Sequence, residues 1–500
     1  MNLGLADVET LMEGSATGRR VVIVGGGVSG LAAAHRLLEL QAANADAPPL
    51  EVVLLEASGR LGGTVRTERR DGFLLEGGPD SFISEKPAAL ELAARLGLRD
   101  RVIETNPAHR RSFVVRGGRL RPTPEGFHLL APARLWPFLT TDIFTWRGKA
   151  RMALELLLPR RAPDDEDDES LARFVRRRFG REALERMAQP MVGGIYTADP
   201  ERLSLRATMP RFLDMEREHR SLILALRRQA RRRPSPSGGA SGARYGLFLS
   251  FDEGMQVLTD ALAARLPTSS LRLHTKADEV LFERASQRWH VKTVGGETIS
   301  ADAVCLALPA YAAARLLRPA DDSLADELDA IPYASTATVN LAYRRDSIPH
   351  PLDGFGFVVP RAEGRAALAC TFSSVKFPSR APAGHALLRA FVGGALQPEM
   401  FDLSEEEMVA AVRRDLRELL GVADAPLFAH VERWPRSMAQ YHVGHLRRLA
   451  RLDARLRDLP GLRLCGNAYT GAGVPDCVRG GEEAAAAILE EFGRRQFSTQ

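Results

Sequence analysis

The sequence predicts an α/β fold, α+β overall, whose first part is a dinucleotide-binding unit of the Rossmann type. Three observations lead to this prediction. Val21 to Val24 form a continuous apolar run, which is typical of a parallel strand buried on both faces. Glycines follow at once, and residues 31–40 then have the pattern of a helix. A second apolar run, residues 51–55, ends at an acidic residue, Glu56.

The glycines after the first strand fall on the pattern G-x-G-x-x-G, at Gly25, Gly27 and Gly30. In a Rossmann unit the first glycine permits a tight turn, and the second lets the backbone approach a pyrophosphate. The third lets the helix pack closely on the strand. The first helical N–H groups then face the phosphates, and Glu56 is placed to accept hydrogen bonds from a ribose diol. The order strand, turn, helix, strand and acid therefore favours a dinucleotide site over a glycine-rich surface turn.

The composition is that of an ordinary globular protein with two or three domains. Its 500 residues are 45% hydrophobic and 26% charged, which provides enough apolar side chains for a sizeable core. The net charge of +5 is small for this length, so no nucleic acid is expected as a partner. The four cysteines show no C-x-x-C spacing. We therefore predict no metal site and no disulfide framework, which suits a reducing compartment.

The N-terminal residues and the apolar runs bear on the location of the protein. The first nineteen residues contain Asp7, Glu9 and Glu13 and no apolar h-region. We expect residues 1–19 to be a disordered tail and not a signal peptide. The chain has no run of about 18 apolar residues, so no membrane-spanning helix is expected. The predicted location is cytoplasmic.

Two more glycine-rich stretches follow the acidic residue. In the first, Arg60 and Arg66 flank Gly62 and Gly63. This combination suits a loop around a diphosphate, because the backbone can come close and the arginines supply charge-assisted hydrogen bonds. The second stretch, residues 75–81, contains two adjacent glycines. A turn with so few side chains fits beside a flat ring system.

Together these stretches resemble the FAD-binding start of a known superfamily. Glu56-x-x-x-Arg60-Leu61-Gly62-Gly63, followed by Gly77-Gly78-Pro79, is similar to the start of the flavin amine oxidases and protoporphyrinogen oxidases. The resemblance implies FAD as the cofactor and an FAD domain of the p-hydroxybenzoate hydroxylase and amine oxidase type. It also implies the cofactor-binding residues, which are Gly25, Gly26, Gly27, Val28, Ser29, Gly30, Glu56, Ala57, Arg60, Gly62, Gly63, Thr64, Gly78, Pro79, Asp80, Ser81, Ala277, Asn467, Ala472, Gly473 and Val474.

The rest of the chain divides into predicted domains by its patterns of strands and helices. We expect an FAD-binding domain over residues 20–90, 245–310 and 455–495, a mainly helical insert over 91–215, and a substrate domain with an antiparallel sheet over 216–244 and 311–454. An FAD domain in three pieces is usual for the flavin class that the sequence resembles.

Four aromatic residues lie in one short segment of the helical insert. Trp136, Phe138, Phe144 and Trp146 stand beside several arginines. They either pack into the core of the protein or form a surface that lies on a membrane. In the second case the insert is membrane-associating, and the protein binds the inner face of the cell membrane peripherally.

Further stretches resemble the protoporphyrinogen oxidase family more specifically. They are Gly194-Ile195-Tyr196 with Leu203-Ser204, residues 218–224 and 353–360, Phe372-Ser373-Ser374 through Phe377-Pro378, Phe391-Val392-Gly393-Gly394, and Gly466-Asn467 with Gly473-Val474. The resemblance implies the six-electron oxidation of protoporphyrinogen IX to protoporphyrin IX in haem biosynthesis. Molecular oxygen is the implied oxidant and hydrogen peroxide the by-product. Implied partners are the porphyrinogen, a second copy in a homodimer, and ferrochelatase.

The resemblance also implies four contacts to the porphyrinogen ring. Phe391 would stack on one face of the ring, and Val358 and Thr371 would contact the other; we call these three the ring-clamp residues. Gly194 would approach a pyrrole through its carbonyl, which requires the absence of a side chain. No side chain is singled out as a general base, so the chemistry is assigned to the flavin.

A β-hairpin predicted over residues 110–121 bears on the binding of a substrate propionate. Relatives of the plant and animal type place an arginine immediately before the aromatic residue of its first strand. Here Ser112 precedes Phe113, and the arginines are Arg110 and Arg111. We predict that Arg111 binds the propionate. This needs a bulge, since alternation along a strand would turn Arg111 to the other face.

Three alternatives stay open. Coproporphyrinogen oxidases of the Gram-positive type, which form coproporphyrin III, share the fold and the cofactor and resemble this chain at Ser112. An amine oxidase or a carotenoid desaturase explains neither Phe355-Gly356-Phe357 nor Phe391-Val392-Gly393-Gly394. A flavin-binding carrier or regulator without turnover is the alternative from another class.

Overall fold

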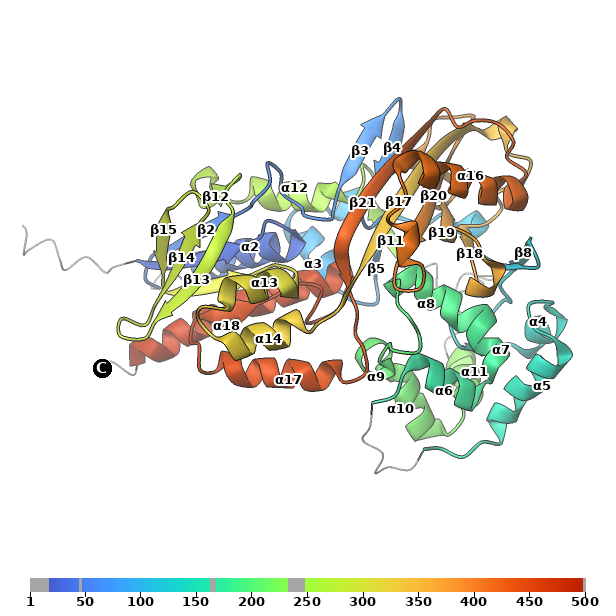
Figure 1. Cartoon of the computed structure of the whole chain (residues 1–500), viewed down its shortest axis with the longest axis horizontal. Coiled ribbons are helices and arrows are strands. Elements are labelled where there is room, and N and C mark those ends of the chain that lie inside the picture. The colour runs from blue at the N-terminus through green and yellow to red at the C-terminus, as the bar shows by residue number, and fades with distance from the viewer. Residues whose placement is uncertain (1–17, 45–46, 162–167, 233–247, 498–500) are drawn as a thin grey trace, which may run out of the picture.

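The computed structural model describes residues 18–44, 47–161, 168–232 and 248–497 (Figure 1). Most of the predicted tail, residues 1–17, lies outside the described residues.

A five-stranded parallel sheet forms the centre of one half of the molecule. Its strand order is β12 (Leu271–Arg272), β2 (Leu50–Leu55), β1 (Arg19–Val24), β16 (Ala303–Leu306) and β22 (Leu462–Leu464). The central strand β1 is apolar on both faces. Val21 and Ile23 pack into one core with helices α2 (Val28–Ala42) and α18 (Val474–Phe497). Val22 and Val24 pack into the other, so the sheet is covered on both sides, as parallel sheets require.

Smaller elements surround this sheet. Helices α3 (Ala88–Arg95) and α12 (Gln256–Ala264) pack into the same core as Val21 and Ile23. An antiparallel sheet packs against its other face, with the buried Trp289 in its middle strand. Its strands are β13 (Ala277–Glu283), β14 (Arg288–Thr293) and β15 (Thr298–Ala301). Other elements nearby are α13 (Ala310–Leu317), α14 (Asp322–Asp329), α17 (His445–Leu456), β5 (Phe82–Ile83), β6 (Val102–Glu104) and β11 (Phe248–Phe251).

A seven-stranded sheet forms the centre of the other half of the molecule. Its strand order is β21 (Phe428–Ala439), β17 (Tyr333–Arg344), β20 (His385–Gly393), β19 (Ala367–Phe372), β18 (Gly356–Val358), β7 (Phe113–Arg116) and β8 (Arg119–Pro122). All neighbours are antiparallel except β18 and β7. Helix α16 (Glu405–Leu420) buries one face of the sheet. The hairpin of β3 (Thr67–Arg70) and β4 (Phe73–Glu76) stands beside the sheet (Figure 1).

A helical region lies below the seven-stranded sheet in Figure 1. Its helices are α4 (Leu135–Thr140), α5 (Trp146–Ala153), α6 (Leu171–Arg178), α7 (Arg181–Ala183), α8 (Gln189–Tyr196), α9 (Leu205–Thr208), α10 (Pro210–His219) and α11 (Leu222–Arg232). A single π-helical turn, Leu184–Ala188, joins α7 to α8. Among the described residues, no helix combines the length and the apolar character needed to cross a bilayer.

Several elements confirm the sequence predictions. The strands predicted over residues 21–24 and 51–55 are β1 and β2, and the helix predicted over 31–40 lies within α2. The predicted hairpin is β7 and β8. One difference concerns its place. The hairpin lies in the segment predicted as a helical insert, yet β7 pairs with β18 and joins the seven-stranded sheet. Val114 and Val115 of β7 are both fully buried, so this strand needs cover on both faces.

Candidate active site

The first glycine turn lies at the carboxyl end of β1, where α2 begins. Gly27 is the N-cap of α2, no side chain caps the helix, and its first turn carries no acidic residue. Its first N–H groups are therefore available to an anion. A Cβ on Gly30 would lie 1.9 Å from the carbonyl oxygen of Gly25, so close packing requires glycine there. A Cβ on Gly27 would meet the Cα of Gly63 at 3.9 Å, an ordinary van der Waals contact, so the protein itself has room for a Cβ there. This cradle fits the pyrophosphate of FAD.

The loop after β2 closes over this turn. Gly62 N donates to the carbonyl oxygen of Gly26 at 2.8 Å. The guanidinium of Arg60 donates to carbonyl oxygens of its own loop, at distances of 2.7 and 3.3 Å. These hydrogen bonds stabilise the conformation of the loop. Arg66 does not face the first turn; it pairs with Glu432 of β21 at 3.1 Å.

Glu56 stands at the end of β2, as predicted, and is half-buried. Its two carboxylate oxygens accept hydrogen bonds from Gly26 N and Ser58 N, each at 2.8 Å. A carboxylate has about four acceptor positions, so both oxygens can still bind a diol. Thr275 N donates to the carbonyl oxygen of Glu56 at 2.8 Å, so Ala277 begins β13 close by. The exposed Ala57 and Thr64 belong to the same loop.

The start of α18 lies at the same edge of the five-stranded sheet. Strand β22 is parallel to β16 and ends at Leu464, so Asn467 follows its carboxyl end. Asn467 is held by its side chain, which donates to the carbonyl oxygen of Ser437 at 2.8 Å. The next predicted residues, Ala472, Gly473 and Val474, lead into α18. The N–H groups at the start of this helix can therefore face the cofactor, as the resemblance implies.

Residues 77–81, which we call the second glycine turn, follow β4. A Cβ on Gly78 would lie 1.7 Å from the carbonyl oxygen of Thr64, so this turn touches the loop that closes the first turn. The side chains of Asp80 and Ser81 are occupied by Lys376. Its Nζ lies 2.9 Å from both carboxylate oxygens of Asp80 and 2.9 Å from Ser81 Oγ. The second glycine turn therefore presents mainly backbone to a flat ring.

Charge holds this turn in place. Burial by itself would raise the pKa of Asp80, but Lys376 and Arg389 hold that pKa well below its usual range. Asp80 is thus a stable anion between two buried cations. The pKa of the neighbouring Glu76 is shifted in the opposite direction. Burial raises the pKa of Glu76 to about 7, although Arg380 lies 3.8 Å away.

The ring-clamp residues share one face of the seven-stranded sheet. Val358 of β18 pairs with Ala369 of β19, which pairs with Phe391 of β20. Thr371 pairs with Arg389, two residues before Phe391. Because side chains alternate along a strand, these residues all point to the same side. We call it the clamp face. It is the face opposite to α16, and all three ring-clamp residues are partly exposed on it.

Gly194 lies over the clamp face. A Cβ on this residue of α8 would lie 3.7 Å from Val358 Cγ1 and 3.8 Å from Ala369 Cβ. The structure thus brings Gly194 together with the clamp. It also changes the expected arrangement, because Phe391 was expected to contact the opposite side of the ring from the other two clamp residues. All three side chains project from one face of the sheet. A porphyrinogen that is contacted on both faces of its ring must therefore insert between Phe391 and the other two side chains.

Comparison with known proteins identifies the family. Residues 28–489 match the family described as flavin containing amine oxidoreductase. The chain belongs to this family. Because the match spans nearly the whole chain and the cradle described above fits the cofactor, the protein is an FAD-dependent oxidase.

Members of the flavin-containing amine oxidoreductase family with curated names include porphyrinogen oxidases. Coproporphyrinogen III oxidase of Bacillus subtilis is 36% identical over 480 residues, covering 94% of this chain and 98% of that protein. The Propionibacterium freudenreichii protein of the same name is 37% identical, covering 94% and 90%. The chloroplastic protoporphyrinogen oxidase of Nicotiana tabacum is 33% identical, covering 95% and 86%.

Solved structures of other proteins have the same fold. A crystal structure from Exiguobacterium sp. 255-15, described provisionally as a protoporphyrinogen oxidase, has a TM-score of 0.82 and 34% identity. It covers 94% of this chain and 99% of that chain. Cyclohexylamine oxidase from Brevibacterium oxydans IH-35A has a TM-score of 0.68 at 19% identity, covers 95% and 100%, and shows the fold alone.

The structure does not bring Arg111 to the clamp face. Its Nε donates to the carbonyl oxygen of Asp353 at 2.6 Å, and its guanidinium forms an ion pair with the carboxylate of the same residue. The guanidinium also lies 5.6 Å from the centre of the Phe113 ring, which packs in the core under α16. No bulge restores it, because β7 begins only at Phe113. Arg111 therefore lies before the strand and is paired with Asp353, and its role as propionate anchor stays a prediction.

Two basic residues that the sequence did not single out, Arg389 and Lys376, lie beside the clamp. Arg389 has 2% and Lys376 8% of its surface exposed. The signal for Arg389 was available, since a residue two positions before Phe391 on a strand must share its face. The approach of Lys376 to Asp80 joins residues 296 positions apart and could not be read from local patterns.

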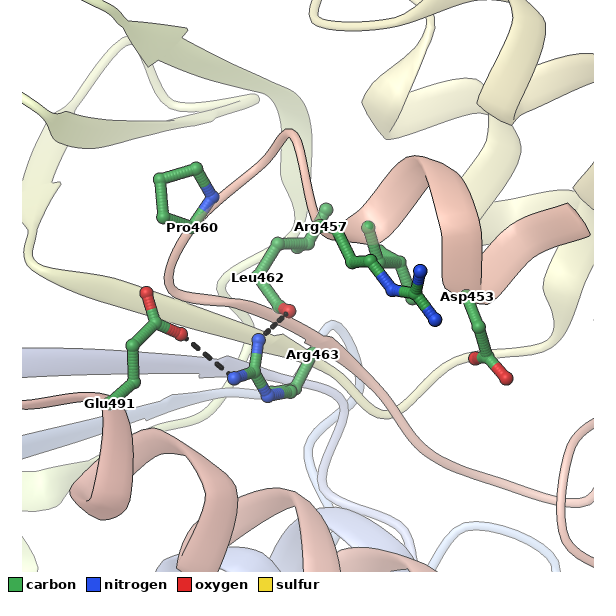
Figure 2. A pocket seen from close by; sticks show the side chains of 7 residues that line it. Asp453, Arg457, Pro460, Leu462, Arg463 and Glu491 are labelled. Atoms are coloured by element: carbon green, nitrogen blue, oxygen red, sulfur yellow. Dashed lines mark hydrogen bonds and ion pairs between the residues drawn. The ribbon is translucent and has the colours of Figure 1, made fainter. Parts of the chain in front are cut away.

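A pocket of about 310 Å³ lies outside this site (Figure 2). It is formed at the amino end of β22, where Arg463 pairs with Glu491 at 2.8 Å. Ligands of parallel sheets bind at the carboxyl ends of the strands, so this pocket is distinct from the family's cofactor site. Among the described residues, no group of three His, Cys, Asp or Glu side chains is placed to hold a metal ion.

Proposed function

We propose that this FAD-dependent oxidase oxidises protoporphyrinogen IX to protoporphyrin IX with molecular oxygen, in haem biosynthesis. One structural observation carries the proposal. The clamp face offers Val358, Thr371 and Phe391, partly exposed, beneath Gly194 and next to the second glycine turn. A large, flat and mostly apolar ring suits such a face better than a small amine does. The names of the relatives, porphyrinogen oxidases over almost their whole length, support it.

The proposed reaction balances in three equal steps. Each step removes two electrons and two protons from the porphyrinogen and reduces one dioxygen to hydrogen peroxide, so that six electrons leave in total. Bound FAD supplies the two-electron chemistry between substrate and oxygen. The chain itself orients the ring: Phe391 and Val358 provide apolar contact, and Gly194 leaves room for a pyrrole beside its carbonyl. The proposal assigns no side chain as acid or base.

Direct turnover tests this function. Purified protein containing FAD is mixed with protoporphyrinogen IX in air, and porphyrin fluorescence and hydrogen peroxide are followed together. We expect three peroxides for each porphyrin formed. A yellow protein that neither bleaches with porphyrinogen under nitrogen nor recovers in air would instead be a flavin-binding protein without turnover, the alternative from another class.

Coproporphyrinogen III is the second candidate substrate. Two observations favour it: the bacterial relatives at 36% and 37% identity are named coproporphyrinogen III oxidases, and Ser112 precedes Phe113 here. The two substrates differ in side-chain charge, since coproporphyrinogen carries four propionates and protoporphyrinogen two. Parallel measurement of kcat/KM for both substrates decides between them.

We also propose that the protein binds a membrane surface peripherally. The four aromatic residues of the helical region divide between the two expected roles. Phe138 and Phe144 are buried and pack on each other, so they belong to the core. Trp136 and Trp146 are 75% and 72% exposed. Large exposed aromatic side chains beside arginines are typical of proteins that lie on anionic lipid.

The homodimer and the transfer of product to ferrochelatase complete this proposal. Both follow from the resemblance and from the poor solubility of the porphyrin product. Sedimentation velocity of the FAD-containing protein tests the first. Co-sedimentation with ferrochelatase tests the second.

A further inference from the structure

The second glycine turn is held by side chains of the seven-stranded sheet. The carbonyl oxygen of Gly77 accepts hydrogen bonds from Trp434 Nε1 at 2.9 Å, from Thr338 Oγ1 at 3.0 Å and from Arg389 Nη2 at 3.4 Å. The same Nη2 donates to the carbonyl oxygen of Gly78. These donors come from strands β21, β17 and β20. The position of the turn is therefore set by the sheet that carries the clamp face.

Arg389 is the donor that also contacts the clamp. Its guanidinium carbon lies 4.7 Å from the centre of the Phe391 ring, close enough for a cation–π contact. One planar group thus contacts the carbonyl of Gly78 on one side and an aromatic clamp residue on the other. The side chain is almost fully buried, so water does not compete for either contact.

Its charge is balanced by a neighbouring acid. Nη1 of Arg389 lies 4.0 Å from Asp80 Oδ2, and Lys376 holds the same carboxylate. Among the described residues, Nε of Arg389 has no hydrogen-bond partner. A buried cation with an unpaired donor is a poor way to gain stability, since its desolvation is only partly offset. This favours a role in geometry.

We propose that Arg389 is a positioning residue that fixes the distance between the second glycine turn and the Phe391 ring. The inference rests on the proposed function, in which the turn lines the flavin and Phe391 contacts the porphyrinogen. Of the three donors that hold the turn, Arg389 would then be the one that ties the separation between flavin and substrate to the Phe391 ring. A displacement of about 1 Å between reacting groups can cost on the order of 100-fold in rate.

Two variants and a matched control test the proposal. Arg389→Met keeps a similar length and loses the charge and the donors. Arg389→Lys keeps the charge and loses the planar group. The control is Arg380→Met. Arg380 is equally buried and donates to Ser250 Oγ at 2.8 Å and Phe251 O at 2.9 Å. Its guanidinium also donates to Asp252 O and Ser379 Oγ, and it contacts neither the second glycine turn nor Phe391 through a hydrogen bond.

The measurements are made on FAD-containing protein. Visible circular dichroism reports the surroundings of the flavin without substrate, and anaerobic stopped-flow reports flavin bleaching by porphyrinogen. We expect both Arg389 variants to retain FAD, to change the dichroism, and to bleach about 10- to 100-fold more slowly than the parent. We expect Arg380→Met to lower the melting temperature while its bleaching rate stays within about twofold.

The outcomes separate this inference from the proposed function. Parent-like dichroism and bleaching in either Arg389 variant would overturn the inference. Equal slowing by Arg389→Met and Arg380→Met would also overturn it, since the effect would then be general to buried arginines. If Arg389→Met does not accumulate, Arg389→Lys carries the test alone. If the parent itself does not bleach with porphyrinogen, the proposed function fails, and the dichroism still decides whether Arg389 positions the turn.

Discussion

The Cα of Gly63 lies 3.9 Å from the position that a Cβ atom would take on Gly27, so a side chain on Gly27 has room in the protein itself. That room is where the pyrophosphate of FAD is proposed to bind. The fold itself requires glycine at position 30, because a Cβ there would collide with the backbone of Gly25. Glycine at position 27 is instead required by the proposed cofactor.

Gly27→Val is expected to fold and to lose FAD. The β-branched side chain fits against Gly63 but occupies the space of the pyrophosphate. The check is the flavin-to-protein absorbance ratio after purification, with far-ultraviolet circular dichroism to confirm the fold. Gly30→Ala serves as the contrast, since it should fail to accumulate as folded protein. A Gly27→Val protein as yellow as the parent would refute the placement of the cofactor.

Gly194→Val is expected to weaken substrate binding without disturbing FAD. A Cβ here makes ordinary contacts with Val358 and Ala369, so the fold accepts it. The added methyl groups stand on the clamp face, and overpacking costs typically about 1–3 kcal/mol, which corresponds to an increase in KM of about 5- to 150-fold. Steady-state kinetics with each porphyrinogen measure it. An unchanged KM would mean that the ring does not reach α8.

Replacing Trp136 and Trp146 together by Ser is expected to abolish flotation with anionic liposomes at low salt. Both side chains are largely exposed, so their loss should leave the melting temperature unchanged. Leu427→Ser is the control, because Leu427 is 54% exposed and lies outside the helical region, beside β21. If the parent protein stays at the bottom of the gradient, the membrane proposal is wrong.

Arg111→Ala is expected to change KM by no more than about twofold, because its guanidinium is engaged by Asp353. Arg110→Ala is the companion variant, since Arg110 pairs with Glu104 at 3.1 Å. A tenfold rise in KM for Arg111→Ala would show that substrate draws this side chain away from Asp353, and would restore it as the propionate anchor.

Glu76→Gln is expected to flatten the pH dependence of stability. The pKa of Glu76 is raised by burial to about 7 in the folded protein, above its usual value. An acid with a raised folded pKa favours folding at low pH, and this contribution is lost as pH rises through about 7. Urea unfolding at pH 5 and pH 8 should show that the parent loses about 2–3 kcal/mol more than the variant over this interval. Parallel curves would contradict the raised pKa.

The sequence predicted the first part of the site well because that part is local. Strand, glycine turn, helix and acid follow one another within residues 21–56, and each has its own signature. Helix α16 is equally local in character, because its capping box and its buried residues lie within one segment. The place of Arg111 was less accessible, because it precedes β7 and pairs with Asp353, which lies 242 positions further along the chain.

The clamp face was accessible only through the resemblance. Val358, Ala369, Phe391 and Thr338 stand in one row across four strands, and their register is set by loops whose lengths carry no pattern. The same holds for the hydrogen bond from Trp434 to Gly77, which spans 357 positions. Such contacts depend on how the two halves of the molecule pack together, which periodicity within one segment does not report.

The order of strands in the five-stranded sheet has a consequence for the synthesis of the protein. The sheet takes β1 and β2 from the first 55 residues, and its edge strand β22 and helix α18 from the last 40 or so. A chain still emerging from the ribosome therefore lacks β22 and α18, which leaves one edge of the sheet unpaired and part of the core around α2 uncovered. The residues proposed to close the flavin site are the last to be made, and a chain that ends before residue 462 would lack them.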